Sequence, residues 1–290
     1  MDVRSCRADS EGQTVGRPPL SRLATRLLRL AVAVAWWSAA ASAAALNVDR
    51  LDPPDLETLH ATLNALEAPI AAKKQDGTAN LLTWEQLCAL LTPAQRAFLD
   101  EFRALRGETL GATSHYFGEP PEPLDLVQVG RQEILQSGAA KPLDPQYLPR
   151  PALAAYRRMM DALQAELGTR LLVESGYRSG AYQLYLFLSY LPKHGDSIRE
   201  TNRFVALPGH SEHGYPPRQA IDFINEAGIN GEDHPEQFEA LPEYAWLQQH
   251  AKTFGFVLSY PRDNPFHTSF EPWHWHYENS ERRVSKEVSK

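Results

Sequence analysis

The stretch FEPWHWHY at residues 270–277 places one carboxylate and two imidazoles among four aromatic side chains. On a β-strand alternate side chains share a face, so His274 and His276 point to one side and the tryptophans to the other. Pro272 lacks a backbone N–H, so this run begins at the edge of a sheet or at a bulge. Such a ribbon can hold a metal ion and place Glu271 beside it as a general base. The alternative is a buried aromatic strand whose two histidines are merely hydrogen-bonded.

A second cluster upstream, PGHSEH at residues 208–213, is followed by Asp222 and favours the metal interpretation. Catalytic zinc takes three protein ligands and keeps one position open for water. His213, Asp222 and His274 can supply the three ligands. Glu271, three positions before His274, can take the proton of the water. Arg178, at the end of an apolar run, can stabilise the oxygen that gains charge.

Apolar periodicity and turn residues predict helices mixed with short strands. Thr83 and Thr92 are expected N-caps, and Gly168 is expected to end a helix. The expected helices are 55–72, one from 83, 92–106, 150–167, 180–191, 198–206 and 242–254. The expected strands are 171–174, 219–225, 256–259 and 271–277, and residues 107–151 are expected to be rich in loops. This order predicts an α+β fold with a small antiparallel sheet and flanking helices.

The sequence divides into four expected segments. Arginines precede an apolar run that ends in small residues, so 1–45 is expected to be a signal peptide or an N-terminal anchor. Residues 46–140 are expected to form a helical N-terminal extension. Residues 141–280 are expected to form the domain that carries the candidate zinc site, which the resemblance described below implies to be a zinc peptidase domain, and 281–290 a charged tail. An export signal predicts a periplasmic or extracellular protein, membrane-anchored where the signal stays uncleaved.

Composition narrows the partners and the metal ligands. The net charge is -7, which argues against nucleic acid as a partner, and contact with a membrane is expected only through an uncleaved N-terminal segment. Of two cysteines, Cys6 lies in the expected signal and only Cys88 lies beyond it. Zinc would therefore be held by histidine and carboxylate side chains rather than by thiolates.

Three ordered blocks resemble those of the zinc D-alanyl-D-alanine carboxypeptidases of the vancomycin-resistance type, within the LAS metallopeptidase superfamily. The blocks are SGYRS at 175–179 with Gln183, PGHSEH at 208–213 with Asp222, and EPWHWHY at 271–277. The resemblance runs over about half the chain. It implies that His213, Asp222 and His274 bind Zn²⁺, that Glu271 is the base and that Arg178 stabilises the transition state. It also implies that Gln183 and Ser211 hold the terminal D-residue of a peptide.

Two features depart from that family pattern. Eight residues separate His213 from Asp222, where the family usually has six. An insertion of two residues keeps the phase of a strand, so Asp222 can still face the metal. His276 stands where an arginine is common, so it is expected to contact substrate or tune the site. It could also compete with His274 for the metal, because other members of the superfamily use a His-x-His pair.

The resemblance implies an exported zinc metallopeptidase, a carboxypeptidase that hydrolyses D-Ala-containing stem peptides of peptidoglycan. Alternatives on the same polymer are L,D-carboxypeptidase, dipeptidase and endopeptidase activity. An alternative of another class is a catalytically silent zinc-binding module of the cell wall. The altered spacing between His213 and Asp222, together with His276, is the reason to retain that last alternative.

Overall fold

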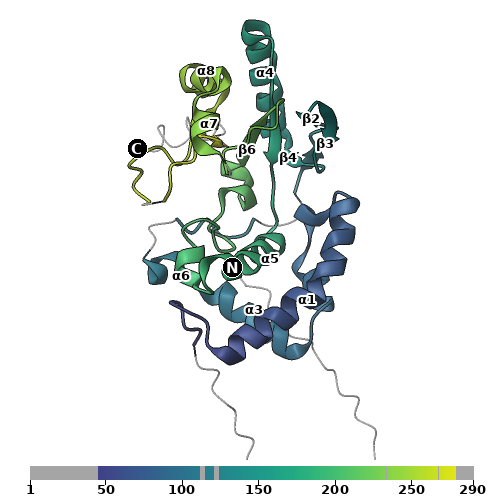
Figure 1. Ribbon diagram of the computed structural model, residues 1–290, viewed down its shortest axis with the longest axis vertical. Helices are drawn as coiled ribbons and strands as arrows, with labels where there is room; N and C mark the ends of the chain where they lie inside the picture. The colour runs from purple at the N-terminus through teal and green to yellow at the C-terminus, as the bar shows by residue number, and fades with distance from the viewer. Residues whose placement is uncertain (1–44, 112–114, 121–123, 233, 267, 279–290) are drawn as a thin grey trace, which may run out of the picture. The chain divides into compact units, whose positions relative to one another are not determined.

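The computed structural model describes residues 45–111, 115–120, 124–232, 234–266 and 268–278 of the chain (Figure 1). The expected signal or anchor, except for its last residue, and the expected charged tail lie outside these residues. The chain from Leu46 onward groups as one compact unit. Within the described residues, no helix is both long enough and apolar enough to cross a membrane.

The helices begin and end largely where local chemistry requires. Thr83 and Thr92 cap their helices through capping boxes with Gln86 and Gln95, as expected for both threonines. Gly168 ends a helix in the left-handed conformation, φ 73°, which glycine adopts without strain. The helices are α1 (Pro53–Gln75), α2 (Trp84–Ala89), α3 (Pro93–Ala104), α4 (Arg150–Leu167), α5 (Gly180–Tyr190), α6 (Ile198–Thr201), α7 (Pro235–Glu239) and α8 (Pro242–His250).

Among the described residues, four strands form the central antiparallel sheet in the order β5-β6-β8-β7. These strands are β5 (Leu171–Ser175), β6 (Ala220–Asn225), β7 (Phe256–Leu258) and β8 (His274–Tyr277). In the register of β6 and β8, Asp222 lies opposite His274 and Ala220 lies opposite His276. The α+β class with a small antiparallel sheet is thereby confirmed.

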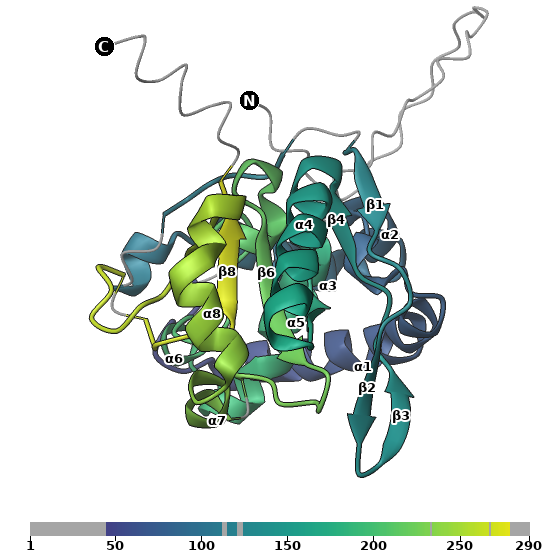
Figure 2. The same cartoon turned by 90° about the horizontal axis from the view of Figure 1, so that it is seen from above.

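One face of this sheet is covered by α4 and α8, which lie over β6 and β8 in Figure 2. The core there contains Met159 and Leu163 of α4, Leu247 of α8, and Phe223 and Trp275 of the strands. Because side chains alternate along a strand, the same pairing turns Asp222 and His274 to the opposite face. The apolar face anchors the sheet, and the other face carries the polar cluster.

A second core joins the N-terminal helices to α5. It contains Leu59 and Leu66 of α1, Phe102 of α3, and Leu184 and Phe187 of α5, all fully buried. Phe102 and Phe187 meet edge to face, with ring centroids 6.1 Å apart. The helical character of the segment after residue 46 is therefore observed, and its core is shared with the helix that follows Arg178. A domain boundary near residue 140 stays a prediction.

Several expected boundaries were wrong. Residues 107–151 are not all loop, because they contain β1 (Leu126–Gln128), β2 (Glu133–Gln136), β3 (Ala139–Pro142) and β4 (Tyr147–Pro149) in two small sheets. The helix expected over 198–206 ends at Thr201, and the one expected over 242–254 continues beyond His250 only as a 3₁₀ turn. The last strand begins at His274 rather than 271, since the His274 N–H donates to the Glu271 carbonyl in a turn.

Candidate active site

Three separate segments bring the sequence-predicted side chains together. Asp222 lies on β6 and His274 begins β8, so the strand register alone sets them opposite each other. His213 lies in a short 3₁₀ helix, Glu212–Gly214, that precedes β6. Arg178 lies in the turn after β5, where its N–H donates to the His213 carbonyl over 3.1 Å. This backbone bond ties the turn of Arg178 directly to the loop of His213.

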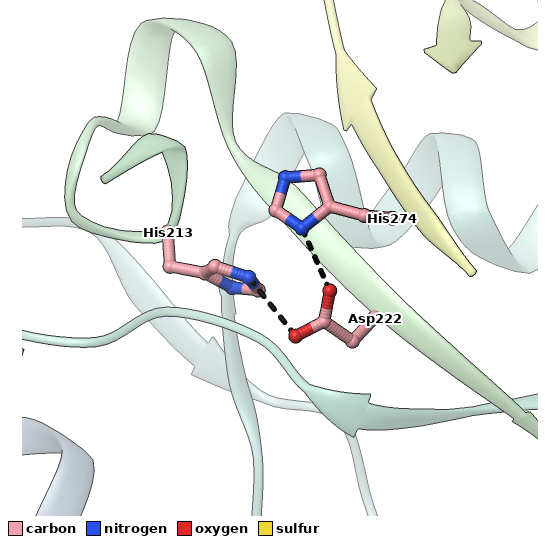
Figure 3. Close-up of side chains that lie close together, drawn as sticks. All are labelled: His213, Asp222 and His274. Carbon is pink, nitrogen blue, oxygen red and sulfur yellow. Dashed lines mark ion pairs between the residues drawn. The ribbon is translucent and has the colours of Figure 1, made fainter. Parts of the chain in front are cut away.

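His213 is oriented by a backbone contact on one ring nitrogen. Its Nδ1 lies 2.7 Å from the Gly176 carbonyl oxygen, which requires the proton to be on Nδ1. Its Nε2 then has no proton and carries a lone pair, and this atom lies 3.1 Å from Asp222 Oδ2 (Figure 3). Such a contact behind a metal-binding imidazole fixes both its tautomer and its ring orientation.

His274 is held in the same manner by a carboxylate. Its Nε2 lies 3.2 Å from Glu212 Oε2, and its Nδ1 lies 2.8 Å from Asp222 Oδ1. Glu212 thus occupies one ring nitrogen and leaves the other facing Asp222 and His213. The two imidazole rings stand nearly perpendicular, with centroids 4.9 Å apart.

These residues fit a divalent metal ion. One ligand atom from each of His213, Asp222 and His274 lies within 4.8 Å of the others. Because the proton of His213 is on Nδ1, His213 Nε2 and Asp222 Oδ2 face each other over 3.1 Å with a lone pair on each atom, and among the described residues no hydrogen bond satisfies His213 Nε2. Buried lone pairs without a donor are costly, and a shared cation would satisfy them. Two imidazoles and one carboxylate form a common donor set of catalytic zinc.

The charges around this group favour a cation in its centre. Burial lowers the pKa of His274, but the negative charge of Asp222 and the contact with Glu212 outweigh burial and raise it to about 10. Burial and the nearby Arg178 guanidinium lower the pKa of His213 to about 4. Burial alone would raise the pKa of Asp222, yet the two histidines hold it well below its usual range. In the metal-free protein, the positive charge of protonated His274 therefore balances the nearby carboxylates, as a metal ion would.

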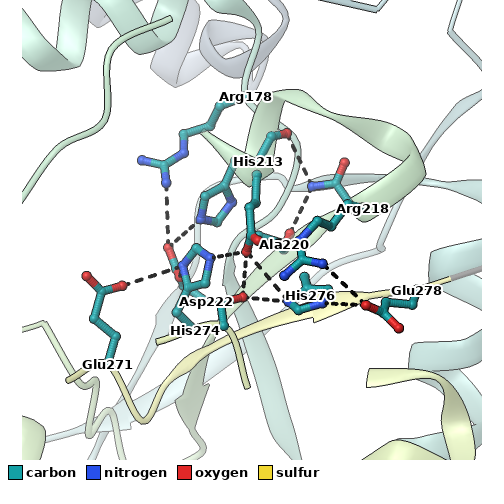
Figure 4. A network of polar contacts seen from close by, with 12 residues as sticks. Arg178, His213, Arg218, Ala220, Asp222, Glu271, His274, His276 and Glu278 are labelled. Atoms are coloured by element: carbon teal, nitrogen blue, oxygen red, sulfur yellow. Dashed lines mark hydrogen bonds and ion pairs between the residues drawn. The ribbon is translucent and has the colours of Figure 1, made fainter. Parts of the chain in front are cut away.

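Glu271 and Arg178 border the same group, as Figure 4 shows. Glu271 Oε2 lies 3.7 Å from His274 Nδ1, and Arg178 Nη2 lies 3.8 Å from Asp222 Oδ2. Burial raises the pKa of Glu271 to about 7, which suits a group that takes and returns protons near neutral pH. One carboxylate and one guanidinium therefore flank the three candidate ligands.

The three residues expected to contact substrate have the following places. Gln183 lies on α5, where its side-chain amide donates to the Ala206 carbonyl over 2.7 Å. Ser211 is buried and directly precedes the turn that carries His213. His276 is 1 % exposed, and its Nδ1 lies 2.7 Å from Ser259 Oγ. Substrate contact by these residues stays a prediction, and the metal-capable group contains His274 rather than His276.

Glu212 was not among the site residues that the sequence predicted. The structure buries it at 3 % exposure and surrounds it with His274, His276, Ser259 and Arg218. Burial would raise its pKa, but the contact with His274 and the charges of His276 and Arg218 lower it. Its position directly before His213 was the one available signal, because its partners come from distant segments.

Comparisons with known proteins find relatives of this chain. The model of the family VanY, D-alanyl-D-alanine carboxypeptidase, matches residues 145–280. The putative carboxypeptidase YodJ of Bacillus subtilis (strain 168) is 32% identical over 158 residues, which cover 54% of each chain. The bifunctional D-Ala-D-Ala dipeptidase and carboxypeptidase VanXYC of Enterococcus gallinarum is 30% identical over 137 residues, which cover 45% of this chain and 67% of that protein.

Among solved structures, the LD-carboxypeptidase LdcB is 28% identical, with a TM-score of 0.43 over 58% of this chain and 75% of LdcB. The chain spans about half the length of YodJ. The family match, residues 145–280, includes every residue of the candidate site: Arg178, His213, Asp222, Glu271 and His274. With the site in place and two thirds of VanXYC covered at 30% identity, the chain belongs to the VanY family of D-alanyl-D-alanine carboxypeptidases.

Proposed function

We propose that this chain is a zinc metallopeptidase that removes the terminal D-alanine from stem peptides of peptidoglycan. The observation that carries the proposal is the convergence of His213, Asp222 and His274 between Glu271 and Arg178. Membership of the VanY family supports the choice of a D-alanyl-D-alanine substrate.

His213 Nε2, His274 Nδ1 and a carboxylate oxygen of Asp222 would hold the zinc ion. When bound, zinc lowers the pKa of water to about 7 and polarises a carbonyl oxygen. Glu271 in its ionised form accepts a proton from the attacking water and returns it to the leaving amine. The Arg178 guanidinium faces the carbonyl oxygen and stabilises the negative charge that develops there.

The test is hydrolysis of a muropeptide that ends in D-Ala-D-Ala, followed by the mass of its products. Chelation should abolish the release of D-alanine, and added zinc should restore it. Glu271→Gln should lower kcat by about 10²–10⁴-fold and still bind zinc, since Gln cannot take the proton. Glu239→Gln is the control: Glu239 is half-exposed on α7, pairs with Arg262 away from the candidate ligands, and its variant should behave as the unchanged protein.

Three outcomes would contradict the proposal. Release of D-alanine that survives thorough removal of zinc would exclude the mechanism. Products of a different mass would instead assign a dipeptidase, an L,D-carboxypeptidase or an endopeptidase. Zinc binding without any cleavage of muropeptides would identify a silent cell-wall module.

We also propose that the protein acts outside the cytoplasmic membrane. The support is the sequence of residues 1–45, with Arg22, Arg26 and Arg29 before an apolar run. A peptidoglycan substrate lies in the same compartment. Residues 1–45 fused to an enzyme that is active only after export should produce that activity, and activity confined to the cytoplasm would contradict the proposal.

A further inference from the structure

A pocket adjoins Arg178 on a side formed by the N-terminal helices. Its lining includes Lys74 and Asn80 from the end of α1 and the turn after it, Asp144 from the loop before β4, and Glu174 and Arg178 from β5 and the following turn. Lys74, Asn80 and Asp144 all precede residue 145, where the match to the family begins. One wall of the pocket therefore lies outside the region that the family model matches.

Close backbone contacts build this wall against the turn of Arg178. The Ser179 N–H donates to the Asn80 carbonyl over 2.9 Å, and the Ser179 hydroxyl donates to the Leu82 carbonyl over 2.6 Å. Gly77 approaches Pro145 so closely that a Cβ would lie 2.4 Å from Pro145 Cγ, and its φ of 68° also favours glycine. The end of α1 is thus fixed beside the reacting centre.

The lining carries charges of both signs. Lys74 and Arg178 are cationic, whereas Asp144 and Glu174 are anionic. Asn80 is 7 % exposed, and among the described residues its Oδ1 is buried without a hydrogen-bond partner. An unpaired buried acceptor beside a pocket is satisfied by a ligand that brings an N–H group. Such a wall suits a ligand with both a carboxylate and an amine.

We propose that this pocket is a substrate subsite for a diamino-acid residue whose side chain carries both an ammonium and a carboxylate. Lys74 would pair with the carboxylate, and Asp144 would pair with the ammonium. Residues of this chemistry occur in peptidoglycan stem peptides, next to the D-alanines. The inference rests on the proposed function and names the part of the substrate that the N-terminal helices recognise.

The experiment compares three peptides that end in D-Ala-D-Ala and differ only in the preceding residue. That residue is diaminopimelate, with an amine and a carboxylate on its side chain, lysine, with the amine alone, or norleucine, with neither. The unchanged protein should favour diaminopimelate by up to about tenfold in kcat/KM over lysine, the equivalent of about 1.4 kcal/mol, and favour lysine over norleucine, because each change of residue removes one charge pair.

Lys74→Met should raise KM about tenfold for the diaminopimelate peptide alone and leave kcat unchanged, as expected for lost binding. Lys73→Met is the matched control, since both lysines lie in the last turn of α1 and act equally on its dipole. Asp144→Asn should remove the preference for lysine over norleucine. These side chains are exposed or half-exposed, so the variants should fold.

Equal kcat/KM for all three peptides, or equal effects of Lys73→Met and Lys74→Met, would overturn the subsite and leave the carboxypeptidase intact. Cleavage of none of the three peptides would overturn the proposed function together with the subsite. The two failures are therefore distinguishable in one set of assays.

Discussion

Glu212 contacts His274, one of the candidate ligands, through a buried carboxylate. Its Oε2 lies 3.2 Å from His274 Nε2, and the opposite edge of that ring faces Asp222. A carboxylate behind a metal-binding imidazole fixes the tautomer and raises the basicity of the ligand. Glu212 is therefore a positioning residue that acts through His274.

Glu212→Gln should weaken zinc binding by about 10–100-fold, because the amide no longer holds His274 as a strong acceptor. Competition with a chromogenic chelator measures the affinity. Glu243→Gln is the matched control: Glu243 is equally buried, and its partner is Thr169 rather than a candidate ligand. Unchanged affinity in Glu212→Gln, with normal thermal unfolding, would remove Glu212 from the account.

His274 makes the stability of the metal-free protein depend on pH. Its pKa is raised from 6.5 to about 10, so its imidazolium stabilises the fold fully below pH 6.5. That contribution is lost as pH rises toward 10. Zinc replaces this proton, so its stabilising effect should grow over the same interval. His213 adds nothing in this window, because its pKa of about 4 keeps it neutral.

Thermal unfolding with chelator and with zinc, measured from pH 6.5 to 10, checks this expectation. The midpoint of the chelated protein should fall across the range, and the difference between the two midpoints should widen. A difference that stays constant with pH would mean that no proton leaves His274 when zinc binds.

At the scale of elements, α5 begins directly after the turn that carries Arg178 and packs in the core with the N-terminal helices. Ser179 caps this helix by accepting the Tyr182 N–H over 3.1 Å, and it also donates to Leu82. Arg178 is the preceding residue, so the cap and the turn that carries Arg178 share one piece of backbone. Loss of the cap should therefore disturb both stability and catalysis.

Ser179→Ala should destabilise the protein by about 1–2 kcal/mol and lower kcat by about tenfold or more, since small displacements of a charged group are costly in catalysis. Thr92→Ala removes the equivalent cap of α3, which lies outside the site, and should cost similar stability without changing kcat. Urea unfolding and steady-state kinetics measure the two effects. Equal kcat in both variants would separate the cap from the placement of Arg178.

Local signals predicted those elements whose chemistry is local. The caps at Thr83 and Thr92 and the stop at Gly168 depend on neighbouring residues, and all three are confirmed. The strands within 107–151 have three or four residues each, and β1 pairs with β4 across the segment that contains β2 and β3. Such short strands show no periodicity, so their existence depends on pairing that the sequence does not display.

The candidate site residues that lie within the three sequence motifs could be predicted, because each motif fixes their spacing along the chain. The phase of β6 survives the two extra residues after His213, and Asp222 does face His213 and His274. The environment of Glu212 was not predictable, because Ser259 and His276 reach it only through the pairing of β7 with β8. The pairing of strands distant in sequence decides what surrounds a metal-binding side chain. The local spacing of residues decides which face of its strand that side chain occupies.

At the scale of the whole molecule, the N-terminal helices and the peptidase segment share a core. Leu59, Leu66 and Phe102 pack in one cluster with Leu184 and Phe187 of α5. Exposure of a core face of this kind costs on the order of 25 cal/mol for each Å² of apolar surface. The segment before residue 140 therefore contributes to the stability of the site as well as to the pocket beside it.

A truncated chain that begins at residue 141 should lose cooperative thermal unfolding and bind a hydrophobic dye, because α5 would expose its apolar side. The chain from 46 to 278 is the matched control and should unfold cooperatively. Calorimetry and dye fluorescence compare the two. A cooperative transition in the shorter chain would show that the expected peptidase domain, 141–280, folds independently.

The central claim is that one metal ion joins His213, Asp222 and His274. Anomalous X-ray diffraction from crystals of the zinc-loaded protein, collected on both sides of the zinc absorption edge, tests it most directly. The account predicts one strong zinc peak about 2.0–2.2 Å from His213 Nε2, His274 Nδ1 and an oxygen of Asp222. A zinc peak elsewhere, or none at these three residues in the loaded crystals, would contradict the account.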